Sequence, residues 1–562
     1  IIEELMHNAV LTKKRVASNT VLIGLRRFGK TAVLQRVYNK LFLEQDAVVP
    51  IYIDLENIAH DSEIEFAKEY FQRFVTHYIA FRKKDPNLAK IEDLPLEVAL
   101  EYAKELGEKE LIEEIERFMD YIKRNHYSGI LMGALTVAKD IADLRNDSIC
   151  IILDEFQEII EILNHRTGKR MDLRGKFRAG AESRRATFIV SGSAVSLITR
   201  KVLGSGPLLG RFSPVYLEGL KERDAVELCN IWSKFLEIVV PEELAVYLGR
   251  RTSGCPYYIK TFLKRAEKLL KAESKKELTK EILSKAIAYE LTSGEIWHEL
   301  EEQLKKYFEL NEWNITRAIL YHSTELLGEF DIIDVDAVVK TVNRDKEEVY
   351  AILSKLARAD LISDDGGVFR KVKDPILVEY LRIQYQLEIE GWKERKNDFI
   401  RNEINNLKRE LGKTKGYLLE YKTREFLRRA GGHKVAGKFF NIPDKEIMIP
   451  VFEEVYTLEF MAPMKRKYQI DATGFYKLEN EETARWVVEV KHHEKPIKKE
   501  YVKKFEDGSK ALYEQIKIPI THQWFVSYSG FTEDALEELK KCNIMYTIGD
   551  QIKELFKLFG VY

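Results

Sequence analysis

The sequence predicts an α/β protein of several domains, in which a parallel sheet near the N-terminus is followed by helical domains and a second α/β domain. Three observations predict this class. The 562 residues exceed what one hydrophobic core usually holds. Apolar runs alternate with helical patterns in the first part of the chain, which is typical of parallel βα units. Near the C-terminus, two successive strand-like runs carry Asp471 and the pair Glu489 and Lys491.

The segment from Val21 to Thr31 is an apolar run, then a glycine-bracketed turn, then a polar helix start. It fits the phosphate-binding pattern G-x-x-x-x-G-K-[ST]. Glycines let backbone N–H groups close around phosphate oxygens, and the helix directs its positive dipole end at the same anion. We expect Lys30 to reach the β- and γ-phosphates of ATP, and Thr31 to hold Mg²⁺. The expected nucleotide-binding residues of this loop are Gly24, Arg26, Arg27, Phe28, Gly29, Lys30, Thr31 and Ala32.

A second apolar run, residues 48–55, predicts a buried strand that carries Asp54 near its end. Asp54 is a candidate for a group beside the magnesium ion, but such a residue more often caps the next helix, and we favour the cap. Residues 62–145 are almost wholly helical in pattern and predict an insertion without a catalytic constellation.

A third apolar run, residues 148–158, places Asp154 and Glu155 directly after buried positions, as in a Walker B strand. We expect Asp154 to contact the Mg²⁺ shell and Glu155 to orient and deprotonate the attacking water. ATP hydrolysis needs both groups, because one charge serves the metal and the other serves as the base. A fourth strand is expected at residues 186–193.

Three segments together resemble the archaeal STAND-type ATPase family over residues 20 to about 300. They are GLRRFGKT at 24–31, LDEFQE at 153–158 and GPLLGRF at 206–212. The resemblance implies a γ-phosphate sensor at Ser191 or Ser193, for which an ordinary strand-ending turn is the alternative. It implies that Arg211 is an arginine finger, for which a structural Arg–carboxylate pair is the alternative.

The resemblance extends to a lid. Residues 217–290 are helical in pattern, and Gly254 and Pro256 open one of these helices as in the lid motif of that family. We therefore expect Gly254 and Pro256 to pack the lid onto the nucleotide, although a proline at a helix start is also ordinary local chemistry.

Three helical patterns and a turn-flanked hairpin in residues 301–385 predict a winged helix-turn-helix. In DNA-binding members of this class, the third helix enters the major groove. Here that helix mixes acidic and basic residues, so we favour a structural or autoinhibitory module over a sequence reader. The best candidates for DNA contacts on the wing are Arg370, Lys371 and Lys373.

The predicted domains are an ATPase core at 1–216 with the insertion at 62–145, a lid at 217–300, the winged helix at 301–385, a helical linker at 386–412, and a C-terminal domain at 413–562.

The C-terminal domain carries a second set of chemical groups. Because side chains alternate along a strand, Glu489 and Lys491 share one face, and Asp471 on the preceding strand is placed to join it. Two carboxylates bind Mg²⁺ through oxygen, and the lysine stabilises developing phosphate charge.

This ordered set resembles the PD-(D/E)xK nuclease superfamily, in its restriction-endonuclease-like branch. The resemblance implies that Glu420 on the first helix is a third metal ligand, beside Asp471 and Glu489, and that DNA is the partner. Mn²⁺ is an alternative to Mg²⁺ at this site. One departure is that Ile470, not proline, precedes Asp471.

The charge balance, the cysteines and the apolar runs of the sequence exclude some classes of protein. The 90 basic and 91 acidic residues balance, which excludes a globally basic nucleic-acid coat but not local basic patches. The four cysteines form no metal-binding spacing, so free thiols in a reducing cytoplasm are expected. No apolar run reaches membrane-spanning length and no signal peptide is visible. Because the first residue is Ile, we expect that further residues precede it.

We therefore predict a cytoplasmic, ATP-hydrolysing protein coupled to a metal-dependent DNA nuclease domain, without a membrane partner and with ATP-dependent self-association. One alternative is a STAND-type regulatory switch whose C-terminal domain binds DNA or protein without cleaving it. A second alternative is a plain assembly ATPase without nuclease chemistry.

Overall fold

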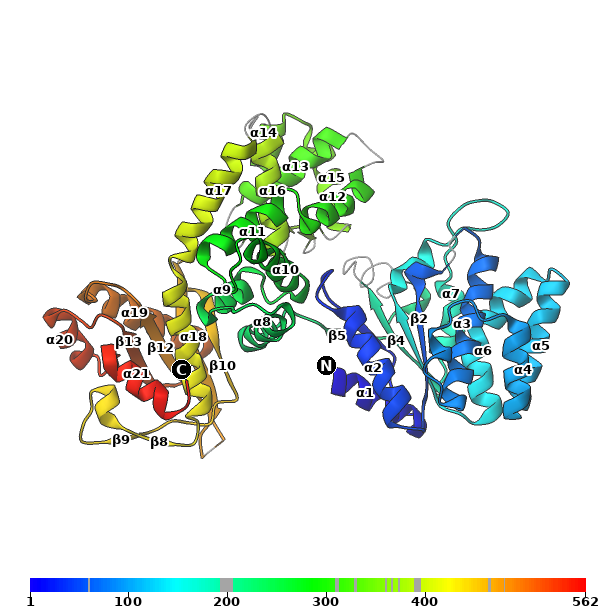
Figure 1. Cartoon of the computed structure of the whole chain (residues 1–562), viewed down its shortest axis with the longest axis horizontal. Coiled ribbons are helices and arrows are strands. Elements are labelled where there is room, and N and C mark those ends of the chain that lie inside the picture. The colour runs from blue at the N-terminus through cyan, green and yellow to red at the C-terminus, as the bar shows by residue number, and fades with distance from the viewer. Residues whose placement is uncertain are drawn as a thin grey trace. The chain divides into compact units, whose positions relative to one another are not determined.

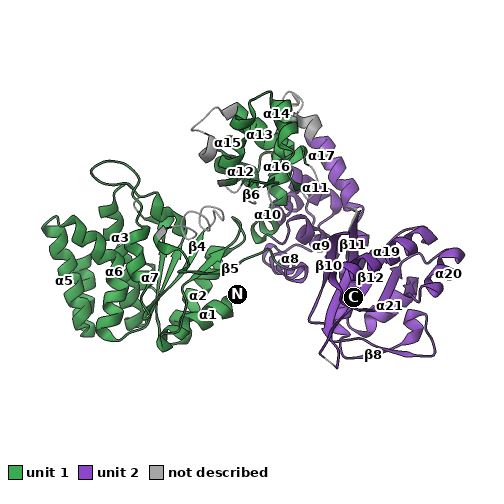
Figure 2. Cartoon of the chain, turned by 180° about the vertical axis from the view of Figure 1, so that it is seen from behind, with its two compact units in different colours: residues 1–220, 255–261, 290–396 green, residues 221–254, 262–289, 397–562 purple. Residues whose placement is uncertain are grey.

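The computed structural model describes residues 1–58, 61–192, 206–308, 313–327, 331–358, 361–364, 367–371, 374–388, 396–462, 466–479 and 481–561. Ser193 and Lys373, named above as candidates, lie outside these described residues. Two compact units interleave along the chain (Figure 2): residues 1–220, 255–261 and 290–396 form one, and residues 221–254, 262–289 and 397–562 form the other. No helix in the described ranges is both long enough and apolar enough to cross a membrane.

A five-stranded parallel sheet organises the first unit. Across the sheet its strands are β2 (Val49–Asp54), β3 (Ile149–Asp154), β4 (Ala186–Gly192), β1 (Thr20–Ile23) and β5 (Ser213–Tyr216). The first four confirm the predicted strands. The edge strand β5 was not predicted, because its four residues are largely exposed and begin Ser-Pro, which shows no apolar pattern.

Helices cover both faces of this sheet (Figure 1). Alternate side chains of β3 face opposite sides, so Ile152 packs with the apolar residues of α1 (Ile2–Leu11) and α2 (Lys30–Glu44). Ile151 packs into the larger core on the other side, which the helical insertion and α7 build. The helices on that side are α3 (Glu63–Lys83), α4 (Leu96–Leu106), α5 (Lys109–Lys123), α6 (Tyr127–Arg145) and α7 (Arg174–Ala181).

The rest of the first unit is mainly helical. Its elements are α12 (Glu295–Phe308), α13 (Trp313–Glu325), α14 (Val335–Val342), α15 (Lys346–Arg358), the strands β6 (Ser363–Asp364) and β7 (Phe369–Arg370), and α16 (Pro375–Glu388). The two short strands pair antiparallel after the three helices α13 to α15. This order of elements is the one that the sequence predicted for residues 301–385.

A mixed sheet in the order β10-β11-β12-β13-β14 forms the core of the second unit. Its strands are β10 (Glu454–Ala462), β11 (Arg466–Lys477), β12 (Thr483–Lys491), β13 (Ile520–Ser527) and β14 (Met545–Ile548), and a separate pair is β8 (Lys434–Ala436) and β9 (Glu446–Met448). The first three strands of the sheet are antiparallel, and β13 and β14 run parallel to β12. Strands β10 and β14 were not predicted from the sequence.

The mixed sheet is covered on both faces. Trp486 and Val488 of β12 pack with α18 (Thr414–Arg429) and α21 (Gly549–Leu558). Val487 between them packs with α19 (Lys499–Ile516) and α20 (Glu533–Lys541). The remaining helices of the unit are α8 (Glu222–Leu236), α9 (Glu242–Arg251), most of α10 (Pro256–Ala272) and of α11 (Lys280–Thr292), and α17 (Lys396–Leu411).

Candidate active sites

The phosphate-binding pattern forms the turn between β1 and α2, at the carboxyl end of the parallel sheet. Gly24 must lack a side chain, because a Cβ there would lie 2.7 Å from the carbonyl oxygen of Leu217. Gly29 adopts φ +91°, which L side chains rarely take. The Lys30 ammonium is buried and donates to the carbonyl oxygens of Gly24, at 2.9 Å, and Leu25, at 3.0 Å. The loop is therefore folded around its lysine.

The other predicted residues of the loop differ in exposure. Thr31 and Ala32 are exposed, Arg26 is half-buried and Phe28 is buried. Arg27 has a left-handed backbone, with φ +68°.

Arg27 makes contacts that the sequence did not indicate. Its Nε lies 3.1 Å from a carboxylate oxygen of Glu299, and its Nη1 donates to Gln303 at 3.1 Å. The Cys255 thiol lies 3.4 Å from the Arg27 carbonyl oxygen, to which it donates. The phosphate-binding loop is thus connected to α12 and to the start of α10.

Asp154 lies buried at the carboxyl end of β3, where the Walker B pattern predicted it. The Ser191 hydroxyl, from the neighbouring strand β4, donates to Asp154 Oδ1. The Tyr52 hydroxyl, from β2 on the other side, donates to Asp154 Oδ2 at 3.2 Å. Tyr52 was missed as a site residue, although its place near the end of a strand beside Walker B was a usable signal.

Glu155 has a left-handed backbone, with φ +50°, directly after the strand. Non-glycine residues in this region store strain, which is concentrated at functional sites. The amide of Gln157 donates to the Glu155 carboxylate. Asp54 accepts from the backbone N–H of Glu56 at 3.1 Å and so caps the following turn, which confirms the favoured interpretation.

The remaining predicted residues of the nucleotide site have local partners. Arg211 is partly exposed and pairs with Glu182 at 2.8 Å, which is the contact expected of the structural alternative. Gly254 follows α9 with φ +69°, and its N–H donates to the Gly249 carbonyl at 2.8 Å. Pro256 is the first residue of α10.

The second site lies on β11 and β12. Asp471 is 5% exposed, and Lys491 Nζ lies 2.9 Å from its Oδ2 and 2.7 Å from Glu489 Oε1. The backbone N–H of Val490 donates to Asp471 Oδ2 at 2.9 Å, and the Gln469 amide donates to Oδ1 at 3.0 Å. The structure therefore brings together the three groups that the strand alternation placed on one face.

The charges in this cluster act on one another. Burial, and after it the negative charge of Asp471, raise the pKa of Glu489 to about 7. Burial opposes the charged form of Lys491, but Glu489 and Asp471 outweigh it and raise its pKa. Lys491 therefore stays positively charged. The nearby carboxylates still repel one another, and a further cation would reduce this repulsion.

Glu420 of α18 belongs to the same charged cluster, because burial and the charge of Asp471 raise its pKa. Its Oε2 accepts a hydrogen bond of 2.8 Å from Arg250 of α9. Arg424, one helical turn beyond Glu420, donates to the backbone carbonyl of Asp471 at 2.6 Å. Sequence reasoning missed Arg424, but its i+4 spacing from Glu420 puts both on one helix face.

The donor set of Glu420, Asp471 and Glu489 fits a hard divalent cation, which prefers carboxylate oxygen. The three are not gathered as a closed ligand set, because Lys491 lies against two of them and Arg250 against the third. In the described residues, one group of three candidate ligand side chains has all its ligand atoms within 4.8 Å of one another. It consists of Glu506, Glu538 and Cys542.

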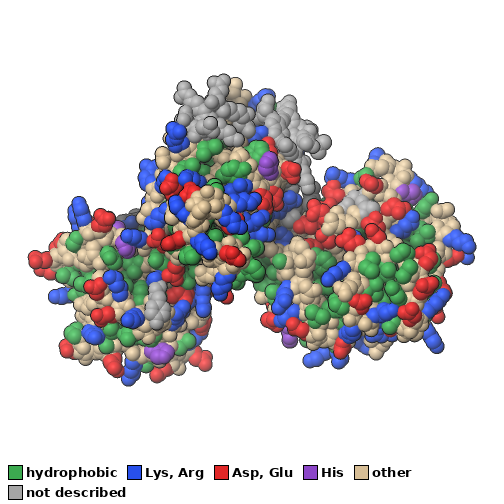
Figure 3. All heavy atoms as spheres, in the orientation of Figure 1, with side chains coloured by type: hydrophobic (Ala, Val, Ile, Leu, Met, Phe, Trp, Pro, Cys, Tyr) green, Lys and Arg blue, Asp and Glu red, His purple; other side chains and the backbone are tan. Residues whose placement is uncertain are grey.

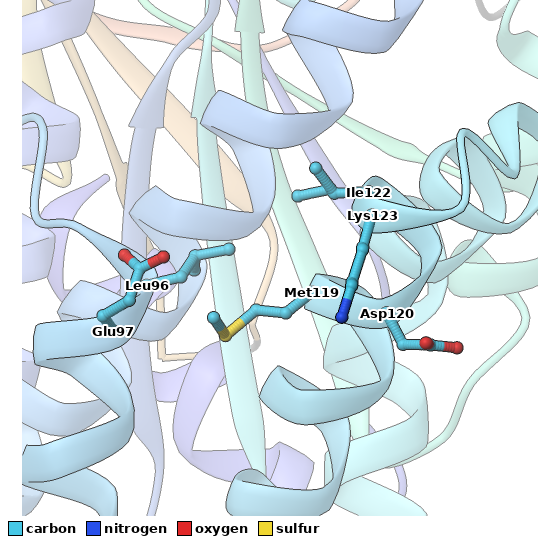
Figure 4. A pocket seen from close by; sticks show the side chains of 6 residues that line it. All are labelled: Leu96, Glu97, Met119, Asp120, Ile122 and Lys123. Carbon is cyan, nitrogen blue, oxygen red and sulfur yellow. The ribbon is translucent and has the colours of Figure 1, made fainter.

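A cavity of about 450 Å³ lies between α4 and α5 of the helical insertion (Figure 4). Its lining mixes apolar and charged side chains: Leu96, Glu97, Met119, Asp120, Ile122 and Lys123. None of these belongs to the phosphate-binding loop or to the Walker B strand, so this cavity is not part of the nucleotide site.

Two family models match the chain where these sites lie. Residues 9–262 match an ATPase domain described as predominantly from Archaea, and residues 460–556 match a restriction endonuclease domain. The chain joins an archaeal-type ATPase domain to a restriction-endonuclease domain. The first match spans the phosphate-binding loop, Asp154 and Arg211, and the second spans Asp471 and Lys491.

Solved structures that are similar to this chain match about two thirds of it. The Walker-type ATPase paby2304 of Pyrococcus abyssi has 19% identity and a TM-score of 0.43, over 67% of this chain and 95% of that one. The ORC2 protein of Aeropyrum pernix has 17% identity and a TM-score of 0.39, over 69% and 94%. The RuvB Holliday junction branch migration motor of Thermotoga maritima has 12% identity and a TM-score of 0.33, over 66% and 91%. The search of curated proteins found no match.

Proposed function

We propose that this protein hydrolyses ATP in its N-terminal domain and cleaves DNA with its C-terminal domain in a divalent-metal-dependent reaction. The observation that carries the proposal is the contact of Lys491 with both Asp471 and Glu489, inside the region that matches restriction endonucleases. This cluster holds the charges that phosphodiester hydrolysis needs, two carboxylates for a cation and one fixed ammonium.

In the ATPase domain, Lys30 would contact the β- and γ-phosphates and Thr31 would hold Mg²⁺. Asp154, oriented by Ser191 and Tyr52, would bind the magnesium shell, and Glu155 would act as the base for water. The motif segments named above support a STAND-type enzyme. Arg211 is the candidate finger, and it would have to leave Glu182 to act in that role.

In the nuclease domain, Asp471, Glu489 and Glu420 would hold Mg²⁺ or Mn²⁺, which supplies Lewis-acid chemistry when bound. Lys491 would stabilise the negative charge that develops on the phosphate. Gln469 and the backbone N–H of Val490 fix the Asp471 carboxylate by one hydrogen bond to each oxygen. This orientation leaves the reacting groups preorganised before substrate arrives.

The proposed winged helix has a smaller part in DNA binding. Its wing residue Lys371 pairs with Asp331 at 2.8 Å. Across the face of the whole chain that Figure 3 shows, acidic and basic side chains are interspersed. The pairing of Lys371 supports a structural or regulatory module here rather than a sequence reader.

Cleavage of supercoiled plasmid tests the nuclease proposal. Wild-type protein with Mn²⁺ or Mg²⁺ should nick the plasmid, and EDTA should stop the reaction. Asp471→Asn and Lys491→Ala should each lower the nicking rate at least about a hundredfold, because each removes charge used in the transition state. ATP hydrolysis should remain.

The matched control is Lys477→Ala, which removes an exposed lysine of β11 that bonds to Thr483. It should nick like wild type. Nicking that persists in both site variants would come from another nuclease and would reject the site. Binding of plasmid without any nicking, under all metal conditions, would favour the regulatory switch instead.

A further inference from the structure

Helices α8 and α9 pack within the same compact unit as the nuclease domain, and α9 contacts α18. Arg250, near the end of α9, donates from Nη2 to Glu420 at 2.8 Å and from Nε to Glu222 at 2.9 Å. Its guanidinium also lies 4.7 Å from the ring centroid of Tyr417. A candidate metal ligand is thus held by a cation from a different part of the chain.

A second contact reaches the same site from α8. Glu222 accepts from Arg424 at 2.6 Å, and Arg424 is only 2% exposed. The other end of the Arg424 guanidinium donates to the backbone carbonyl of Asp471 at 2.6 Å and to Thr457 at 2.9 Å. Helix α9 therefore contacts the Glu420 carboxylate through Arg250. Helix α8 is linked to the backbone of Asp471 through Glu222 and Arg424.

These contacts border a cavity of about 630 Å³ lined by residues of α8, α9, α17, α18, β10 and β11. Its charges are paired across the cavity walls: Lys221 lies 2.5 Å from Glu454, and Arg251 lies 2.6 Å from Glu410. Paired charges suit a closed ionic contact between protein elements better than a phosphate-binding groove, which needs unpaired basic groups.

We propose that Arg250 is an inhibitory positioning residue of the nuclease site, which neutralises Glu420 and keeps this carboxylate from binding a divalent cation with Asp471 and Glu489. The inference rests on the proposed nuclease site and adds how that site is restrained. The guanidinium and a metal ion compete for the same oxygens, so removal of the guanidinium charge must favour the metal. In the structure, Arg250 and Lys491 contact the carboxylate oxygens that a metal ion would otherwise bind, as this competition predicts.

Binding of Mn²⁺ without nucleotide, followed by electron paramagnetic resonance of the free ion, tests the inference independently of cleavage. Arg250→Gln and Arg250→Met should each raise Mn²⁺ affinity about tenfold, the scale typical of residues that orient a ligand. A further Glu420→Gln substitution should remove this gain. Arg250→Lys keeps the charge and should stay close to wild type.

Arg251→Gln is the matched control, because the neighbouring guanidinium pairs with Glu410 and Tyr247 instead. It should leave Mn²⁺ affinity unchanged. Arg250→Met retains an apolar stem against Tyr417, so it reports on charge even if Arg250→Gln unfolds.

Wild-type Mn²⁺ affinity in folded Arg250→Met would overturn the inference, as would a gain that survives Glu420→Gln or one equally large in Arg250→Lys. A gain in Mn²⁺ affinity without plasmid nicking in any variant would reject the proposed nuclease activity and uphold the restraint on Glu420. Plasmid nicking by the wild type, with no gain in Mn²⁺ affinity in the Arg250 variants, would support the nuclease activity and reject the restraint on Glu420.

Discussion

At the scale of single residues, both candidate sites are built around a lysine, which is buried in the case of Lys30 and half-buried in the case of Lys491. Lys30 bonds to two carbonyl oxygens of its own loop, and Lys491 bonds to two carboxylates on adjacent strands. A lysine held by two carboxylates leaves its site negative overall and suited to a metal.

Lys30→Ala should lower ATP hydrolysis at least about a hundredfold, because phosphoryl transfer depends on positioned charge. Phosphate release under saturating ATP measures this. Lys40→Ala on the same helix, which removes an ion pair with Glu3, should hydrolyse ATP normally. Wild-type hydrolysis by Lys30→Ala would mean that the loop is not the nucleotide site.

At the scale of elements, the helical insertion stabilises the sheet that carries the ATPase site. The rings of Phe71 in α3 and Phe118 in α5 stack at 3.8 Å between centroids, and both side chains are fully enclosed in the core. The same core includes Ile151 of β3, on the face of the sheet opposite to α1 and α2. The insertion is therefore part of the ATPase domain's stability, although it supplies no residue to the site.

Phe71→Ala should destabilise the ATPase domain by about 3–5 kcal/mol, through lost burial and the cavity left behind. Calorimetry of the whole chain checks this, since ATP should raise the melting temperature of the domain that binds it. The ATP-sensitive transition should move down in Phe71→Ala. It should not move in Leu144→Ala, which truncates an exposed side chain of α6. An unchanged transition in Phe71→Ala would show that the insertion contributes no stability to this domain.

At the scale of the whole molecule, covalent continuity joins the two proposed activities. The segment 221–254, which carries Glu222 and Arg250, belongs to the nuclease unit. Its flanking residues belong to the ATPase unit: the Leu217 N–H donates to the Ile23 carbonyl at 2.7 Å, and the Cys255 thiol donates to Arg27. The segment that carries Arg250 is therefore covalently joined at both ends to residues of the first unit.

Arg211 lies well after the Walker B strand, which suits a finger that completes a neighbouring subunit's site. We predict that ATP promotes self-association and that Glu155→Gln holds the assembled state, because it keeps Asp154 but loses the base. Sedimentation with and without ATP measures this. Mixing Arg211→Ala with Lys30→Ala protein should partly restore hydrolysis, because each supplies the group that the other lacks.

Arg178→Ala is the control for this mixing experiment, because Arg178 pairs with the same Glu182 carboxylate at 2.8 Å. Arg178→Ala protein should hydrolyse ATP by itself, without the addition of a second variant. Monomeric Glu155→Gln with ATP bound, together with a mixture that recovers no activity, would instead indicate a site completed within one chain.

The sequence by itself determined the features that consecutive residues encode. The glycine and lysine spacing of residues 24–31 predicts the loop, and strand alternation predicts that Glu489 and Lys491 share a face. Both are local, because backbone geometry over a few residues settles them. The edge strand β5 escaped this reasoning, because four mostly exposed residues carry no periodic pattern.

Only the tertiary structure decided which distant charges meet. Arg250 lies 170 positions from Glu420, and Arg27 lies 276 positions from Gln303. No sequence motif around either arginine predicts which residue it contacts. Such pairs form because packing of helices and strands brings side chains within hydrogen-bond distance, and a buried charge must then find a partner. The local patterns thus predicted the chemical groups of each site, and tertiary packing decided what restrains them.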